Sequence, residues 1–279
     1  MTDLLAVNGV ELCVDTFGSP VDPAILLIHG ASASMDHWES EFCERLAAGP
    51  RYVIRYDHRD TGESTSYEPG KPQYTGEDLV TDPIGILDAL KIDKAHLVGI
   101  SMGGVIVQQL AVEHADRVAS ITVASTSPSG PSDPELPPPT DKVSASFSDD
   151  RPIDWSDTEA ALDRLIEDDR LYAGSLPYDE PARRALYAQA LARTPDPATM
   201  TNHYLAEGGE PIRHRLGEIA VPALVLHGTE DPLFPPAHGE ALAREIPGAR
   251  LVLLEGAGHE LPRTTWDIVV PEILAITAR

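Results

Sequence analysis

The sequence predicts an α/β domain in which a mostly parallel sheet is covered by helices on both faces and interrupted by a helical insertion. Short β-like runs alternate with helical patterns through much of the chain, which is typical of such sheets. The alternation stops between about Ser127 and Leu216 and then resumes. With 279 residues, of which 42% are hydrophobic, the chain is long enough to bury one large core.

Six apolar runs predict the buried strands, because parallel strands covered on both faces are apolar along their whole length. They are AILLIHG (24–30), RYVIRYD (51–57), AHLVGIS (95–101), VASITVAS (118–125), ALVLHG (223–228) and ARLVLLEG (249–256). The run GVELCVDTF (9–17) alternates polar and apolar residues, so we expect an antiparallel edge strand there. Apolar residues at helical spacing predict helices over 38–48, 75–91, 103–114, 237–246 and 264–278.

The insertion begins with a proline-rich connector, PSGPSDPELPPPTDK (128–142), which can form neither a central strand nor an uninterrupted helix. Helical patterns follow over 157–171, 179–193 and 196–207. A second independent domain is the alternative interpretation. Because strands remain to complete the sheet afterwards, we expect a helical cap over 127–216 and a core formed by 1–126 and 217–279.

Composition and charge limit the partners. A formal charge of −24 repels nucleic acid and anionic membranes, so we expect neither as a partner. It favours neutral or cationic small molecules as substrates; an acidic surface unrelated to the substrate is the alternative interpretation. No apolar stretch is long enough to cross a membrane, and the start MTDLLAVNGVEL lacks the features of a secretory signal. Two cysteines, Cys13 and Cys43, form no disulfide framework. We therefore expect a cytoplasmic protein, monomeric or homodimeric.

The segment HLVGISMGGVIVQQLA (96–111) changes from an apolar strand to an apolar helix around Ser101. A serine at such a corner projects above the carboxyl edge of the sheet, beside the helix N-terminus. Gly99 and Gly103 lack the β-carbons that would clash in so tight a turn. The pattern Gly-x-Ser-x-Gly is weak evidence alone. Between a strand and a helix, it favours a nucleophile over an ordinary glycine-rich turn.

A serine nucleophile requires a base and an acid that orients the base. The run LVLHGTEDPLFP (224–235) leaves its strand at Asp231, and LVLLEGAGHELP (251–262) leaves the next strand and presents His259. Glu230 is the alternative acid, but its spacing is less favourable. The segment VASTSPSG (123–130) contains no carboxylate, which further supports Asp231.

The chain resembles the α/β-hydrolases from end to end, through HGASAS after the third strand, GISMGG, GTEDPLFP and GAGHELP. The resemblance implies an eight-stranded, mostly parallel sheet with a helical cap. It implies that Ser101 is the nucleophile, that His259 is general base and then acid, and that Asp231 holds the imidazole. The oxyanion hole would be the backbone N–H groups of Ala31 and Met102.

The resemblance also assigns a structural role to the loop DHRDTGES (57–64), with Arg59 in an ion pair and His58 outside catalysis. His29 would shape the oxyanion loop. We expect His203 at the surface or in a pocket wall. The candidate substrate-binding residues are His29, Ser32, Trp155, Tyr204 and Leu233, with core packing as the alternative for the last three.

A serine nucleophile excludes the haloalkane dehalogenases and epoxide hydrolases of this family, which use aspartate there. RYDHRDTGEST, GISMG and EDPLFPPAHG are similar to the aclacinomycin methylesterase group and to cofactor-free haloperoxidases. The resemblance implies hydrolysis of a methyl ester or lactone of an organic molecule, such as a polyketide or macrolide. Carbon–carbon bond hydrolysis, amide hydrolysis, perhydrolysis, acyl transfer and a non-catalytic receptor remain alternatives.

No metal-binding or nucleotide-binding motif appears, so we expect no metal and no cofactor.

Overall fold

A computed structural model describes residues 2–128, 135–149, 151–209 and 211–278, which form an eight-stranded sheet in the order β1-β2-β4-β3-β5-β6-β7-β8. Strand β2 pairs antiparallel with β1 and β4, and the remaining neighbours pair in parallel. The mostly parallel sheet expected from the sequence is confirmed. The strands are β1 (Asp3–Val7), β2 (Val10–Phe17), β3 (Ala24–Ile28), β4 (Tyr52–Tyr56), β5 (Ala95–Ile100), β6 (Val118–Ala124), β7 (Ala223–Gly228) and β8 (Arg250–Leu254).

The edge of the sheet differs from the prediction. Strand β2 is antiparallel, as expected, but it is not the edge strand, because β1 pairs with its outer side. The two strands are joined by Asn8 and Gly9, both with positive φ (49° and 82°). This is the geometry of a tight two-residue hairpin, for which Asn-Gly is the favoured sequence. Strand β1 is short and mostly exposed, although four of its five residues are apolar.

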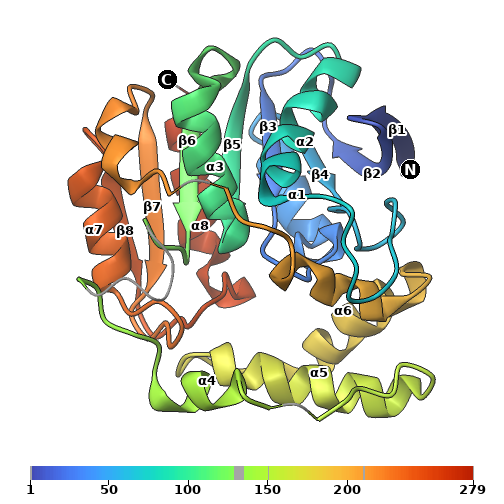
Figure 1. Cartoon of the computed structure of the whole chain (residues 1–279). Helices are drawn as coiled ribbons and strands as arrows, with labels where there is room; N and C mark the ends of the chain where they lie inside the picture. Colours follow the sequence, from blue (N-terminus) through green and yellow to red (C-terminus); the bar gives the residue numbers. More distant parts are fainter. Residues whose placement is uncertain (1, 129–134, 150, 210, 279) are drawn as a thin grey trace.

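Helices cover both faces of the sheet (Figure 1). On one face, α2 (Gly76–Ala89), α3 (Met102–Glu113) and α7 (Ala237–Glu245) share a buried apolar cluster with the strands. On the other face, α1 (Ser40–Ala47) and α8 (Trp266–Thr277) form a second cluster. Short 3₁₀ segments are η1 (Met35–His37), η2 (Ala115–Arg117) and η5 (Arg263–Thr265). The carboxyl ends of the parallel strands therefore stay free to carry functional loops.

Between β6 and β7 the chain forms α4 (Asp141–Ser146), α5 (Thr158–Tyr172), α6 (Glu180–Arg193), η3 (Pro197–Tyr204) and η4 (Arg213–Glu218). The side chains of Thr140, Asp157, Asp179 and Asp196 cap the first four by accepting from backbone N–H groups. Helices α4 and α5 lie across one end of the sheet (Figure 1). Part of the proline-rich connector, residues 129–134, lies outside the described residues.

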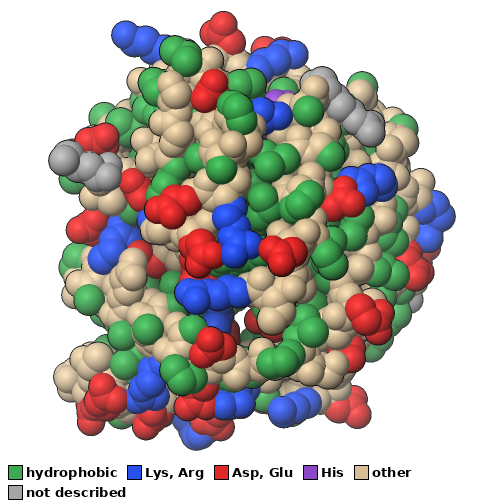
Figure 2. Space-filling model, turned by 180° about the vertical axis from the view of Figure 1, so that it is seen from behind, with side chains coloured by type: hydrophobic (Ala, Val, Ile, Leu, Met, Phe, Trp, Pro, Cys, Tyr) green, Lys and Arg blue, Asp and Glu red, His purple; other side chains and the backbone are tan. Residues whose placement is uncertain are grey.

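The face opposite the view of Figure 1 carries acidic and basic side chains side by side, with a hollow between the helical segment at the bottom and the core (Figure 2). Within the described residues, no helix is long and apolar enough to cross a membrane.

Candidate active site

Ser101 is the single residue between the end of β5 and the first residue of α3. Its backbone has φ 55° and ψ −120°, a conformation that costs a non-glycine residue about 1–3 kcal/mol. A Cβ at Gly99 would overlap the carbonyl oxygen of Gly103, and a Cβ at Gly103 would overlap that of Ile28. The corner is therefore as tight as the sequence predicted, and only glycine fits on either side of the serine.

The structure brings Ser101, His259 and Asp231 together in one hydrogen-bonded chain. His259 Nε2 lies 3.0 Å from Ser101 Oγ, and His259 Nδ1 lies 2.9 Å from Asp231 Oδ2. With Nδ1–H donating to the carboxylate, Nε2 is left as the acceptor that faces the serine hydroxyl. This tautomer lets the imidazole take the proton of Ser101.

Asp231 is buried and held by several donors. Its Oδ1 accepts the backbone N–H groups of Leu233 (2.9 Å) and Phe234 (2.8 Å). Burial by itself raises the pKa of this carboxyl, but His259 and the backbone donors outweigh that effect and hold the pKa below its usual value. Asp231 therefore remains ionised beside the imidazole, as an orienting acid must.

His227 is a neighbour of this site that the sequence analysis missed. It is the penultimate residue of β7 and fully buried, with Nε2 donating to the carbonyl of Phe234 at 2.7 Å and lying 3.6 Å from Asp231. Burial lowers its pKa, so the ring is neutral. It supports the turn that presents Asp231. A histidine near the end of an apolar strand was the available signal.

The two expected oxyanion donors lie next to Ser101. Met102 is the first residue of α3, so its N–H has no acceptor within the helix. On the other side, a Cβ on Gly30 would lie 3.1 Å from Ser101 Cβ and 3.6 Å from its Oγ, which places the Gly30–Ala31 loop directly against the serine. The Gly30–Ala31 loop and the start of α3 thus both adjoin the serine, and an oxyanion hole formed by the Ala31 and Met102 N–H groups stays a prediction.

Ser32, one of the predicted substrate-binding residues, connects the oxyanion loop to η3, and its contact with substrate stays a prediction. Its hydroxyl donates to the carbonyl of Met200 at 2.8 Å, and its N–H donates to His203 Nδ1 at 2.9 Å. Ser32 also has a positive φ of 61°. Because both polar groups bond to η3, Ser32 attaches the oxyanion loop to the insertion. His203 is buried rather than exposed, and its Nε2 donates to the carbonyl of Arg59 at 2.8 Å.

His29 packs within the oxyanion loop. Its ring lies 5.2 Å from that of His37 and 5.3 Å from that of Trp38, and its Nδ1 accepts the N–H of Gly30 at 2.7 Å. Burial, with a contribution from His37, holds its pKa well below the usual value. The neutral ring shapes the loop, as expected; a contact with substrate stays a prediction.

The loop after β4 is held by buried contacts. Arg59 forms two hydrogen bonds with Asp82, at 2.7 and 2.8 Å, and both side chains are buried. His58 Nε2 donates to the carbonyl of His29 at 3.1 Å, and burial lowers the pKa of His58 to about 3. His58 is therefore a neutral structural residue, consistent with its exclusion from catalysis.

The insertion contacts the loop that carries His259. The N–H of His259 donates to the carbonyl of Tyr172 at 2.8 Å, and the Tyr172 ring lies 6.0 Å from the imidazole. The Phe234 ring lies 5.5 Å from the imidazole. A Cβ at Gly258 would overlap the carbonyl of Tyr172. This backbone contact joins two segments that are far apart in the sequence, and no sequence pattern predicts it.

The remaining predicted substrate-binding residues differ in how exposed they are. Leu233 is half-buried beside Asp231, and Trp155 is half-buried in the turn before α5. Tyr204 is 71% exposed at the end of η3, so it forms no buried wall. Glu230 accepts from Ser175 Oγ at 2.7 Å, whereas Asp231 takes the position beside the imidazole. Among the described residues, no group of three or more His, Cys, Asp or Glu could hold a metal ion.

The family model of the alpha/beta hydrolase fold matches residues 23–262, and the chain therefore belongs to the α/β-hydrolase family. Over 99% of its length the chain is 34% identical to rhodomycin D methylesterase DauP of Streptomyces sp. (strain C5), of which it covers 98%. It is 32% identical, with the same coverage, to rhodomycin D methylesterase DnrP of Streptomyces peucetius. The solved enol-lactonase from Burkholderia xenovorans LB400 matches 99% of this chain and 100% of its own at 27% identity and a TM-score of 0.77.

Proposed function

We propose that this α/β-hydrolase cleaves a carboxylic ester through an acyl-enzyme on Ser101. The proposal depends on the hydrogen-bonded chain from Ser101 through His259 to Asp231, with the serine at a strained corner between β5 and α3. The carboxylic ester hydrolase class expected from the sequence is confirmed by the two full-length relatives, both of which are named methylesterases.

The proposed reaction has two steps. Ser101 Oγ attacks the ester carbonyl carbon while its proton passes to His259 Nε2, and the carbonyl oxygen becomes an anion that the N–H groups of Ala31 and Met102 stabilise. The C–O bond to the alcohol then breaks, and the alcohol leaves with the proton from His259. Water, deprotonated by His259, attacks the acyl carbon and releases the acid and Ser101.

For the substrate, we propose a methyl ester on a polyketide of the anthracycline type. The names of DauP and DnrP support this choice. Two aromatic rings near His259, those of Tyr172 and Phe234, would suit an aromatic substrate. The charge of −24 would help to attract a substrate that carries an amino sugar. Lactone opening is the second candidate, supported by the similarity to an enol-lactonase.

We propose that residues 127–216 act as a cap over this site, because α5 and η3 contact the histidine loop and the oxyanion loop.

We also propose a cytoplasmic enzyme, monomeric or homodimeric, that acts on small molecules without nucleic acid or membrane. Two buried free thiols, Cys13 and Cys43, suit a reducing compartment.

The test is an incubation of wild type and Ser101→Ala with anthracycline methyl esters, macrolides and p-nitrophenyl esters, followed by mass spectrometry. We expect Ser101-dependent loss of a CH₂ unit from a methyl ester. Gain of one water by a macrolide would instead support lactone opening. Absence of Ser101-dependent turnover on all substrates would contradict the proposal.

A further inference from the structure

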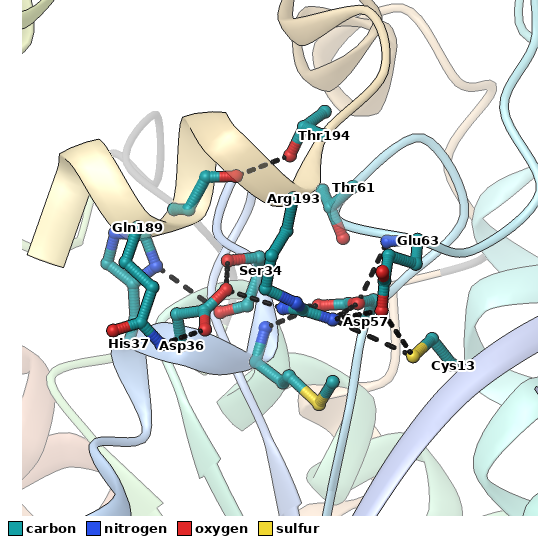
Figure 3. A network of polar contacts seen from close by, with 12 residues as sticks. Cys13, Ser34, Asp36, His37, Asp57, Thr61, Glu63, Gln189, Arg193 and Thr194 are labelled. Carbon is teal, nitrogen blue, oxygen red and sulfur yellow. Dashed lines mark hydrogen bonds and ion pairs between the residues drawn. The ribbon is translucent and has the colours of Figure 1, made fainter. Parts of the chain in front are cut away.

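Arg193, in the last turn of α6, reaches from the insertion into the core and contacts three carboxylates (Figure 3). Its Nη1 lies 2.5 Å from Asp36, and its Nη2 lies 2.6 Å from Asp57 and 3.2 Å from Glu63. Gln189, one turn earlier on α6, donates to Asp36 at 2.8 Å. The end of α6 thus binds two core loops, one after β3 and one after β4.

The two aspartates hold the segment that follows the expected oxyanion donor. Asp57 accepts the N–H of Met35 at 2.8 Å, and Asp36 accepts the hydroxyl of Ser34 at 2.8 Å. Asp36 itself belongs to this loop, in η1. Ala31 lies three residues before Ser34. Its position therefore depends on a loop whose far end is fixed by Asp36 and Asp57.

The guanidinium also balances buried charge. Asp57 is 0% and Asp36 is 3% exposed. Asp36 Oδ2 and Asp57 Oδ1 both face Nη1 of Arg193, so removal of the arginine would leave two neighbouring carboxylates without their shared cation. Like charges that close repel each other, and buried charges without a partner are costly. The loop would have to move to separate or hydrate them.

We infer that Arg193 is a positioning residue, which cross-links Asp36 and Asp57 and so holds the oxyanion loop with the Ala31 N–H at the reacting carbonyl. The inference rests on the proposed function. It gives the insertion a part in catalysis beyond covering the site: α6 fixes the end of the oxyanion loop, while η3 fixes Ser32 within it. Arg193 contacts neither Ser101 nor His259 among the described residues.

The test compares Arg193→Ala with Arg184→Ala, a matched control on the same helix. Arg184 pairs with Glu159 and Asp163 of α5, away from the oxyanion loop. With a p-nitrophenyl ester, we expect Arg193→Ala to lower kcat at least about tenfold while KM changes less than about twofold, because a displaced oxyanion donor acts on the transition state. Millimolar ethylguanidinium should restore part of kcat in this variant only. A kcat close to wild type, or a loss confined to KM, would overturn the inference.

A second readout does not require activity. Hydrogen exchange of the peptide spanning 29–37 should be faster in Arg193→Ala than in wild type and Arg184→Ala. Equal exchange would overturn the inference even if the wild type hydrolysed no ester, an outcome that would refute the proposed function separately. If Arg193→Ala does not fold, Arg193→Lys replaces it, since one ammonium cannot bridge two carboxylates with the geometry of a guanidinium. A folded Arg193→Lys with wild-type kcat and wild-type exchange would also overturn the inference.

Discussion

The backbone N–H of His259 donates a 2.8 Å hydrogen bond to the carbonyl oxygen of Tyr172, the last residue of α5. The histidine of the candidate site is thus positioned by the insertion as well as by the core loop after β8. The contact needs glycine beside it, because a Cβ at Gly258 would overlap the Tyr172 carbonyl and lie 2.5 Å from the N of Gly174.

We therefore predict that Gly258→Ala displaces His259. Overpacking of this kind costs about 1–3 kcal/mol, so Tm should fall by several degrees, and kcat should fall at least about tenfold. The control is Gly217→Ala, where an added Cβ would meet no atom within 4 Å. Thermal melts and ester hydrolysis measure both effects. A Gly258→Ala variant with wild-type kcat and Tm would show that the contact is dispensable.

Replacement of Asp231 tests the orienting acid. Asp231→Asn keeps the shape but offers His259 Nδ1 an amide in place of a carboxylate, which loses the stabilisation of the imidazolium and disturbs the tautomer. We predict a fall in kcat of about 10³–10⁴-fold. Glu230→Gln, one residue away and bonded to Ser175, should stay within a few-fold of wild type. The reverse order of effects would identify Glu230 as the acid.

The strained backbone of Ser101 predicts that glycine at this position gives a more stable protein than alanine. At φ 55° and ψ −120°, glycine is unstrained whereas alanine is not. Ser101→Gly should therefore be about 1 kcal/mol more stable than Ser101→Ala, and both should lack turnover. Urea unfolding of the two variants provides the comparison. Equal stabilities would mean that the corner stores no strain.

Two histidines, the buried His58 and the half-buried His37, predict a loss of stability in acid. Burial lowers the pKa of His58 to about 3 and that of His37 to about 4, from an ordinary value of 6.5. Between these values the unfolded chain binds protons that the folded chain does not. The free energy of unfolding is therefore unaffected by these groups above about pH 6.5. Below that pH it falls by up to about 1.4 kcal/mol per pH unit for each histidine, until the pH reaches the folded-state pKa of that histidine.

The measurement is the free energy of unfolding in urea at about pH 7.5 and about pH 5. We expect a clear decrease at the lower pH, and a smaller decrease in His58→Asn, which has one fewer group to protonate on unfolding. A stability that does not change between the two pH values would contradict neutral burial of these rings.

The sequence predicts well which strand each functional motif follows, because each motif depends on residues that are neighbours in the sequence. The Gly-x-Ser-x-Gly corner needs its glycines for steric reasons that neighbouring residues alone determine. Asp231 and His259 follow apolar strands whose carboxyl ends meet at the same edge of the sheet. The spacing of these motifs thus predicts which residues meet, and the structure places them within hydrogen-bonding distance.

Contacts between the insertion and the core could not be predicted in the same way. Ser32 and His203 are separated by 171 positions, and Arg193 and Asp57 by 136, and no motif marks the partner in the insertion, His203 or Arg193. The bonds of Ser32 to η3 were not predicted for this reason, and its contact with substrate stays a prediction. Strand β1 was missed because it is short and its apolar residues Leu4 to Val7 do not alternate with polar ones, although Asn8-Gly9 signals a hairpin.

The acyl-enzyme on Ser101 is tested by trapping the acyl group. Wild type is mixed rapidly with a p-nitrophenyl ester and quenched in acid, and the digested protein is mapped by mass spectrometry. A burst of p-nitrophenol with the acyl group on Ser101, absent from Ser101→Ala, is the predicted result. Steady turnover that persists in Ser101→Ala, or an acyl group on another residue alone, would contradict the account.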